Sequence, residues 1–489
     1  MNKYSKKLAV MTLAAALGTG TLPLMAQSAA AAPLSAQAIQ EAVNRLADLQ
    51  VMNGYEDGSM RENNPITRAE LAKLVSLAFG IQGGSGISLA DVKPQAWYAD
   101  YAAGLVEQQV METADGRFEP QAVVTDDELI RTVTKALKRD VKSVQYWAED
   151  FYAQGSSATR GEAAYLLSTA REAIPSADAR IVSIRALNAI TLIVDFDKPL
   201  TVDNEAFVQA KEDFAFNDGL AISNMPRLKT GSAATYIVPT TVQKPGAAYT
   251  LTYKGQAAGT FTGNAAKLDM TEARQVANDT FELEALKANG VVDYGYIIAA
   301  YSGGRGANAF VLDENDKDEN GKAYQIISSG QAREVTITPE GGQPIIAKYV
   351  PFTQSTDGKQ EPKFRLPEGE TLKPGVKYTV TSDWARIANP TFTAKEIAPL
   401  QIAGAEAVGE TSIQVVLAGD PGDELFSGRS VQLTDGNGNR LTATYRYSSR
   451  QGATGVFDLA AGTKLTPGVA YTVAPVGDWA GQSQAELKL

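Results

Sequence analysis

The sequence predicts a multidomain protein in which an all-α N-terminal third is followed by all-β sandwiches. Its 489 residues are too many for one hydrophobic core and suit roughly three to five domains. Up to about residue 175, apolar residues recur at helical spacing. After about residue 180, short alternating runs are separated by Gly, Asn and Asp turns, which is typical of all-β domains.

Composition excludes several classes of function. The chain has 45 Lys and Arg against 56 Asp and Glu, a net charge of −11, so it lacks the basic surface that nucleic acid binding requires. The absence of cysteine excludes disulfides, thiol catalysis and cysteine zinc sites. The absence of histidine excludes a Ser-His-Asp triad. Any enzyme built on this chain would have to use carboxylates, tyrosine or lysine.

Residues 1–32 are expected to be an export signal. Three lysines are followed by the apolar run "LAVMTLAAAL" and the small residues "MAQSAAAA", which predict cleavage between Ser28 and Ala32. No later stretch reaches the ~20 apolar residues that a membrane span needs. We therefore expect an exported protein without a membrane span. Its lack of cysteine fits the wall surface of a Gram-positive cell better than a disulfide-stabilised secreted protein.

Residues 33–174 are predicted to form one helical module, because a unit of two helices recurs along them. The units lie at about 35–80, 88–138 and 144–172. The loop "DGSMRE" of the first unit returns as "DGRFEP" in the second and is missing from the third. Repeats of this length bury their apolar faces only against each other, so we expect the three units to pack together.

An arginine begins a helix in two of these units. "TRAE" from Thr67 to Glu70 and "TRGE" at the start of the third unit both predict capping boxes, which make Arg68 and Arg160 the first helical residues. The helix dipole disfavours a cation there. Either the arginines pair with nearby carboxylates, or each helix start and its guanidinium together bind an anion. The sequence leaves both alternatives open.

The N-terminal third resembles the surface-layer homology (SLH) modules that attach exported proteins to bacterial walls. The matching segments are "GYEDGSM…ITRAEL", "LADVKPQAWYADYAAGLVEQQV…DGRFEP…VTDDEL" and "YWAEDFYAQG…TRGEA". The resemblance implies a three-pronged helical module that binds a pyruvylated secondary cell wall polysaccharide in the grooves between its prongs. It implies that Arg68 and Arg160 contact the pyruvate carboxylate and that Trp97 and Trp147 pack near the sugar. The candidate polysaccharide-binding residues are Arg68, Arg160, Trp97, Trp147, Glu70, Gly54 and Asp57.

Two departures from the family pattern limit the number of grooves. The second unit has Asp126 and Asp127 at its helix start, which suit the dipole but would repel an anion. The third unit lacks the loop that would form a wall of its groove. We therefore expect one or two competent grooves.

The β region is predicted to contain three tandem sandwiches, at 178–266, 267–397 (with insertions) and 398–489. The echoes "KPGAAYTL", "LKPGVKYTV" and "LTPGVAYTV" recur at spacings that suit such domains. They resemble the turn and strand of fibronectin-III or Ig-like domains, in which a tyrosine hydroxyl holds the preceding corner. The corresponding tyrosines, which we expect to be structural, are Tyr249, Tyr378 and Tyr471.

An acidic stretch raises the question of calcium. Asp316, Asp318 and Asn320 precede Gly321 as at the start of an EF-hand loop. The twelfth position of that loop would be Ile327 instead of the bidentate glutamate, so the EF-hand match fails. We therefore predict no metal or cofactor, with calcium at these three residues as the alternative.

Together these features predict a cell-surface structural protein that is not an enzyme. The helical module would anchor it to the wall, and the sandwiches would form or join a surface layer by self-association. The alternatives are a wall-anchored adhesin or a glycan-active exoprotein that uses two carboxylates. The enzyme alternative is disfavoured because the sandwich repeats account for the residues after the anchor, leaving no room for a separate catalytic domain.

Overall fold

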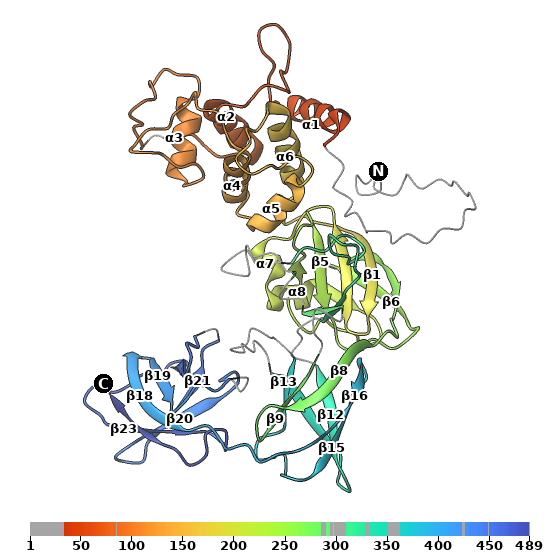
Figure 1. The fold of residues 1–489 in the computed structure, drawn as a ribbon, viewed down its shortest axis with the longest axis vertical. Helices are drawn as coiled ribbons and strands as arrows, with labels where there is room; N and C mark the ends of the chain where they lie inside the picture. Colours follow the sequence, from red (N-terminus) through yellow and green to blue (C-terminus); the bar gives the residue numbers. More distant parts are fainter. Residues whose placement is uncertain are drawn as a thin grey trace, which may run out of the picture. The chain divides into compact units, whose positions relative to one another are not determined.

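The computed structural model describes residues 34–84, 86–284, 290–293, 297, 310–327, 333–350, 362–422, 426–447 and 449–488. The expected export signal, 1–32, lies outside these residues. The described chain is mostly β, with its long helices confined to the N-terminal third (Figure 1). None of the helices in these ranges has the length and apolarity to cross a membrane.

The described part of the N-terminal third contains six helices. They are α1 (Ala36–Asp48), α2 (Arg68–Phe79), α3 (Ala99–Glu107), α4 (Asp126–Leu137), α5 (Val141–Ala148) and α6 (Arg160–Glu172). Their apolar faces meet in one core that includes Leu46, Leu71, Leu129 and Leu167, all of them inaccessible to solvent. Because each helix is short, this shared core accounts for most of their stability.

The first β region consists of two facing antiparallel sheets, as predicted for a sandwich. One has the order β1 (Ile181–Asn188), β2 (Thr191–Phe196), β5 (Thr235–Pro239) and β4 (Arg227–Leu228). The other has the order β3 (Phe214–Phe216), β6 (Ala248–Tyr253) and β7 (Gln256–Thr262). Leu192, Tyr236 and Leu251 lie in the core between them. Two short helices, α7 (Val202–Glu205) and α8 (Phe207–Asp213), interrupt the β pattern, so the region is not purely β.

A segment assigned to the second sandwich packs on the first. The parallel pair β10 (Val291–Asp293) and β11 (Gln325–Ile327) belongs to it. Val292 and Ile326 form a small core with Ile193 of β2 and Ile237 of β5. The residues that alternate with these on β2 face the main core, so both faces of β2 are buried. A strand that is buried on both faces has a continuous run of apolar residues in its sequence. The segment "TLIV" of β2 contains such a run.

The second β region is one curled sheet, not the predicted pair of sheets. Its order is β16 (Ala385–Asn389), β8 (Leu268–Gln275), β9 (Thr280–Leu283), β14 (Lys363–Arg365), β13 (Ile345–Val350), β12 (Glu334–Pro339), β15 (Lys377–Thr381) and β17 (Thr391–Thr393). The edge strand β17 lies against β8, near the opposite edge. The sheet therefore curls around its own core and is barrel-like.

The last β region is a closed barrel, which also corrects the sandwich prediction. Its order is β18 (Ile402–Gly409), β19 (Ser412–Leu417), β22 (Thr454–Leu459), β21 (Arg440–Tyr445), β20 (Ser430–Asp435), β23 (Tyr471–Pro475) and β24 (Ala485–Lys488). Closure comes from β24, which pairs with β23 on one side and runs parallel to β18 on the other. This pairing of the first and last strands removes the open edges that a sandwich would leave.

The expected structural role of the three tyrosines is confirmed. In each case a backbone N–H five residues earlier donates to the tyrosine hydroxyl, and the tyrosine is buried. The bonds are Lys244 N to Tyr249 at 2.9 Å, Lys373 N to Tyr378 at 2.9 Å and Thr466 N to Tyr471 at 3.2 Å.

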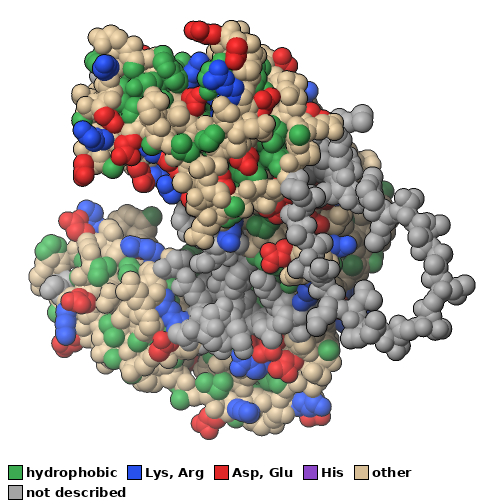
Figure 2. Space-filling model, turned by 45° about the horizontal axis from the view of Figure 1, so that its top comes forward, with side chains coloured by type: hydrophobic (Ala, Val, Ile, Leu, Met, Phe, Trp, Pro, Cys, Tyr) green, Lys and Arg blue, Asp and Glu red, His purple; other side chains and the backbone are tan. Residues whose placement is uncertain are grey.

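On the face shown in Figure 2, basic and acidic side chains are interspersed and do not form separate patches of one charge.

Candidate functional site

Three helices of the N-terminal third begin in the same way. In α2, α4 and α6 a threonine side chain accepts from the backbone N–H three residues later. These bonds join Glu70 N to Thr67 at 3.3 Å, Glu128 N to Thr125 at 3.2 Å and Glu162 N to Thr159 at 3.1 Å. In α2 and α6 the glutamate also accepts from the threonine N–H, so both predicted capping boxes are confirmed.

The segments before these helices close a ring of backbone hydrogen bonds. Ile66 N donates to Ala158 O at 2.9 Å, Ala158 N to Val124 O at 2.9 Å, and Val124 N to Ile66 O at 3.0 Å. All three side chains are completely buried. We call Ile66, Val124 and Ala158 the hub. It brings the starts of three helices, far apart in sequence, to one place with approximate threefold symmetry.

The arginine-headed helix starts have no open N–H groups for an anion. Arg68 N donates to Ala122 O and Ala69 N to Pro120 O, both at 2.9 Å. The corresponding bonds on α6 run from Arg160 N to Asn64 O at 2.9 Å and from Gly161 N to Glu62 O at 2.8 Å. The third N–H in each helix goes to the threonine cap. An anion site formed by a helix start requires unpaired N–H groups, and the first three N–H groups of α2 and α6 all have partners within the protein.

The Arg160 guanidinium holds the first loop in place. It donates from Nη1 to Glu70 Oε1 at 2.9 Å and from Nε to Met60 O at 3.0 Å, and a longer bond reaches Asn53 O. It also lies over the Tyr55 ring, 4.8 Å from its centroid. The side chains of Arg160 and Glu70 are only 6% and 17% exposed. Burial would raise the pKa of Glu70, but hydrogen bonds from Tyr55 and Thr67 and the charge of Arg160 outweigh it, so the pKa lies below its ordinary value.

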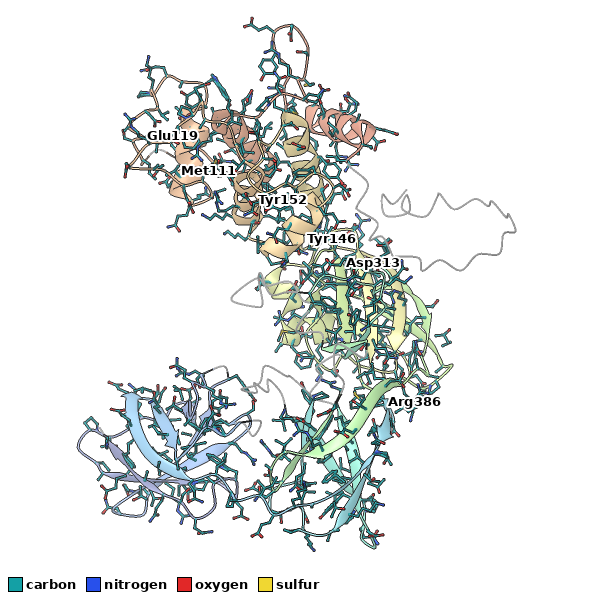
Figure 3. All side chains as sticks on the ribbon, in the orientation of Figure 1. Met111, Glu119, Tyr146, Tyr152, Asp313 and Arg386 are labelled. Carbon is teal, nitrogen blue, oxygen red and sulfur yellow. The ribbon has the colours of Figure 1, made fainter. Side chains whose placement is uncertain are left out.

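Arg68 repeats this arrangement on the second loop. It donates from Nε to Phe118 O at 2.7 Å and from Nη2 to Glu112 O at 2.6 Å, and Nη1 pairs with Glu128. Met111 and Glu119, labelled in Figure 3, bracket this loop. The bond to Glu112 O lies at the exposed end of the guanidinium, whereas all three bonds of Arg160 are partly buried. The ion-pair alternative for both arginines is therefore what the structure contains.

The third helix start has the opposite charge. Asp126 is 2% exposed, and its Oδ2 accepts from Ala153 N at 2.9 Å. Its Oδ1 is buried without a hydrogen-bond partner among the described residues. Burial raises the pKa of Asp126, and the nearby charges of Glu162 and Asp127 raise it further. Tyr152, labelled in Figure 3, donates to Asp127 at 2.8 Å. The abridged third loop thus presents N–H and O–H donors where the other two loops present carbonyl oxygens.

Trp97, Asp57 and Gly54 lie outside the hub. Trp97 is 58% exposed, and Lys73 Nζ is 5.9 Å from its ring centroid. Asp57 accepts from the N–H and hydroxyl of Ser59 and pairs with Arg61, and these hydrogen bonds lower its pKa to about 2. A side chain at position 54 would meet Ser59 O at 3.2 Å. Asp57 and Gly54 therefore shape the first loop.

Trp147 is not available to a sugar in this structure. Its indole is 6% exposed, belongs to the helical core, and donates from Nε1 to Gly231 O at 2.8 Å. The resemblance alone placed Trp147 beside a ligand, whereas the first β region covers it.

The residues of the calcium alternative do not converge. Asp316 Oδ1 accepts from Lys229 at 2.7 Å and Oδ2 from Arg185 at 2.8 Å, so cations already occupy both oxygens. Asp318 accepts from Asn320 N, Lys322 N and the Tyr324 hydroxyl within its own hairpin. Within the described ranges, no three acidic side chains are grouped as a metal ion would require.

Three residues around the two arginines were not anticipated as partners from the sequence. Tyr55 donates to Glu70, Glu128 pairs with Arg68, and Phe118 lies under the Arg68 guanidinium, 4.9 Å from it. Glu128 could have been found, because it occupies the same place after its threonine as Glu70 does. The loop carbonyl oxygens could not have been found in this way, because every residue has a backbone carbonyl and the sequence does not mark which of them accept.

The first of these loops and the helix start that follows it match a known domain family. The family model for the S-layer homology domain matches residues 33–72, which include α1, the first loop and the start of α2. Over these residues the chain is therefore similar to an S-layer homology domain.

Its relatives are named for bacterial surfaces. It is 30% identical over 165 residues to "Surface layer protein" of Brevibacillus choshinensis, a match covering 32% of this chain and 15% of the relative. It is 31% identical over 163 residues to "Middle cell wall protein" of Brevibacillus brevis, covering 31% and 15%. It is 28% identical over 123 residues to "Surface-layer 125 kDa protein" of Lysinibacillus sphaericus, covering 23% and 10%. The matches thus span at most 15% of these much longer relatives.

Solved structures with similarity include S-layer proteins. Domains 1–6 of the surface layer protein SbsC match at 12% identity over 92% of this chain and 72% of that chain, with a TM-score of 0.16. The N-terminal part of SbsC matches at 16% identity over 74% and 76%, with a TM-score of 0.20. At these TM-scores the likeness carries no argument about fold.

Proposed function

We propose that this protein is a non-enzymatic structural protein of the bacterial cell surface, exported by residues 1–32 and held at the wall by its helical module. The SLH match at residues 33–72 carries this proposal. Relatives named as surface-layer and cell wall proteins support it. In this proposal the β regions form or join a surface layer.

The module comprises three SLH repeats, at about 35–80, 88–138 and 144–172. The hub supports this division, because each repeat contributes one residue to the ring and one threonine-capped helix. Largely distinct hydrophobic cores support the further divisions near residues 178, 267 and 398, with Ala189 and Ile190 of the first β region packing into the second β core. The described residues of the insertion (290–293, 297 and 310–327) then belong in space to the first β region.

The proposed ligand is a pyruvylated secondary cell wall polysaccharide. A polymer of this kind carries carboxylates. These suit the starts of α2 and α6, which begin with arginine, and not the start of α4, which begins with aspartate. We assign the direct carboxylate contact to Arg68, whose Nη2 lies at an exposed edge. The exposed indole of Trp97, with Lys73 beside it, offers a stacking surface for a sugar. Arg160 and Glu70 act as positioning residues that hold the loop shaped by Gly54 and Asp57.

Sedimentation with cell walls tests this proposal. The full chain should sediment with native walls of the source bacterium and stay in solution with walls stripped of their acidic polymer. Equal sedimentation with both preparations would exclude the polymer as the ligand. Trp97→Ala should weaken binding without changing the melting temperature, because the side chain is mostly exposed.

Arg68→Ala removes a charge-assisted contact worth ~1.5–3 kcal/mol, so wall affinity should fall roughly ten- to a hundred-fold. Arg68→Lys should recover only part of the affinity, because lysine lacks the planar donor fork. Both variants are compared with the parent below their melting temperatures, since Arg68 also pairs with Glu128. Folded Arg68→Ala protein with parental affinity would show that Arg68 only positions its loop.

A further inference from the structure

The loop between β4 and β5 lies where three parts of the chain meet. It comprises residues 229–232, which we call the junction loop. Its four residues contact the helical module on one side and, on the other, described residues of the insertion (290–293, 297 and 310–327), which we call the insertion below. The first β region, which contains the loop, is the third part. Tyr146 of the helical module and Asp313 of the insertion are labelled in Figure 3.

Helix α5 supplies most of the contacts on the helical side. Gly231 N donates to Ser143 Oγ at 2.9 Å, and Gly231 O accepts from Trp147 Nε1 at 2.8 Å. Arg139, just before the helix, donates from Nη2 to Ser232 O at 2.5 Å. Arg139, Ser143 and Trp147 are each at most 6% exposed. Buried polar groups like these are costly to leave without their partners.

The insertion supplies the contacts on the other side. Lys229 Nζ donates to Asp316 Oδ1 at 2.7 Å and to Asp313 O at 2.6 Å. The Lys229 and Asp316 side chains are 2% and 4% exposed, so this ion pair is shielded from water. Thr230 N donates to Ile297 O at 2.6 Å.

Gly231 is the point of closest approach. Its φ of +83° is one that glycine adopts readily and other residues rarely do. A Cβ there would lie 2.7 Å from Val311 Cγ1 and 2.9 Å from Tyr146 Cδ1. The helical module and the insertion therefore approach the loop from two sides with no room for a methyl group.

The chain that connects the module to the first β region is also held. Ser176 N donates to Pro199 O at 2.9 Å, and Lys254 Nζ donates to Ala177 O at 2.7 Å. Lys198 Nζ reaches Arg171 O, near the end of α6, at 3.4 Å. The short connection is thus bound to the β region along its length.

We infer that the junction loop locks the helical module, the first β region and the insertion into a single body. Domains joined by small interfaces usually move relative to one another. Here the buried hydrogen bonds and the Lys229–Asp316 pair oppose separation, because parting the surfaces would leave these groups without partners. A module held at the wall would then fix the direction in which the β regions project. The inference itself does not depend on wall binding.

Gly231→Ala tests the lock, with Gly219→Ala as its matched control. Gly219 lies in the same β region at a φ of +76°, but a Cβ there meets nothing within 4 Å. Both substitutions introduce the same kind of backbone strain, and only the first pushes the three parts apart. Small-angle X-ray scattering of the full chain should show a larger radius of gyration for Gly231→Ala alone. Amide exchange in residues 139–148 and 229–232 should be at least about tenfold faster in that variant.

A double variant approaches the same contact from the helical side. Ser143→Ala with Trp147→Phe removes both partners of Gly231 and keeps the ring in the helical core. It should reproduce the scattering and exchange changes, and it remains informative if Gly231→Ala does not fold. Scattering and exchange indistinguishable from Gly219→Ala in both variants would overturn the inference. So would a parent chain whose scattering already requires independent motion of the module.

Discussion

The helix starts of α2 and α6 differ from that of α4 in the sign of one side chain. All three have a threonine cap and meet at the hub, yet α2 and α6 begin with arginine and α4 with aspartate. The difference follows the loop that each side chain meets. The two long loops present carbonyl oxygens to a guanidinium, whereas the abridged third loop presents Ala153 N to a carboxylate.

The neighbouring loop, and not the helix dipole, selects the charge at these positions. An exposed charge at a helix end changes stability by ~0.3–1 kcal/mol. Removing one partner of a buried ion pair costs about 3–5 kcal/mol. The second effect is larger, so an arginine is retained at the positive end of a helix when a glutamate and two carbonyl oxygens surround it.

Loss of Arg160 should have the largest effect. Arg160→Ala leaves Glu70 without its cation and the first loop without its donor, in a pair whose side chains are 6% and 17% exposed. We expect the free energy of unfolding to fall by about 3 kcal/mol. Arg160→Lys should recover part of this loss, since it keeps the charge but not the fork. Denaturant unfolding followed by circular dichroism measures both. A loss below about 1 kcal/mol in Arg160→Ala would mean that the pair behaves like a surface salt bridge.

Glu205 is a buried carboxylate whose nearest guanidinium lies beyond hydrogen-bonding distance, unlike Glu70 beside Arg160. It is 4% exposed, its nearest guanidinium, that of Arg227, is 3.7 Å away, and burial raises its pKa from 4.5 to about 7. The folded chain therefore binds the proton more tightly than the unfolded chain, and this contribution to stability is lost as pH rises from 4.5 to 7.

Glu205→Gln should remove that pH dependence. The amide keeps an acceptor for the Tyr236 hydroxyl. Parent and variant should have equal free energies of unfolding near pH 4.5, and at pH 7 the variant should be more stable by up to about 3 kcal/mol. Denaturant titrations across this range provide the measurement. Parallel pH profiles for the two proteins would show that Glu205 titrates alike in the folded and unfolded chains.

Substitution of Asp126 should change the free energy of unfolding least. As for Glu205→Gln, the variant should be the more stable protein at pH 7. Asp126→Asn removes a buried charge that faces Glu162 and keeps an acceptor for Ala153 N. Because burial raises the pKa of Asp126, the variant should be more stable than the parent at pH 7, and the two should converge as pH falls. A variant less stable than the parent at pH 7 would indicate that the charged carboxylate is needed for the short third loop.

Features set by neighbours in sequence were predictable. The capping boxes at Thr67 and Thr159 and the corners at Tyr249, Tyr378 and Tyr471 formed as expected. In each, the two bonded groups lie three to five residues apart, so the local backbone geometry alone brings them together. The change from helical to strand periodicity was predictable for the same reason.

Partners far apart in sequence were not predictable. Nothing near Arg160 indicates that its acceptors lie in the first loop, and nothing near Trp147 indicates that Gly231 covers it. The closure of the last barrel depends on β18 meeting β24, strands at opposite ends of the region. These pairings are decided by which surfaces are buried together, and the alternation of residues along one strand is the same in a sandwich and in a barrel.

The amino-acid sequence by itself therefore determined where the helices begin, how the corners turn and which side chains are apolar. Those outcomes depend on hydrogen bonds and periodicities within a few residues. Only the tertiary structure decided that Arg68 and Arg160 pair with glutamates, that Asp126 meets an N–H group, and that the insertion covers β2. The stability of a buried charge or an apolar face depends on which groups exclude water from it. Here those groups belong to segments that are distant in the sequence.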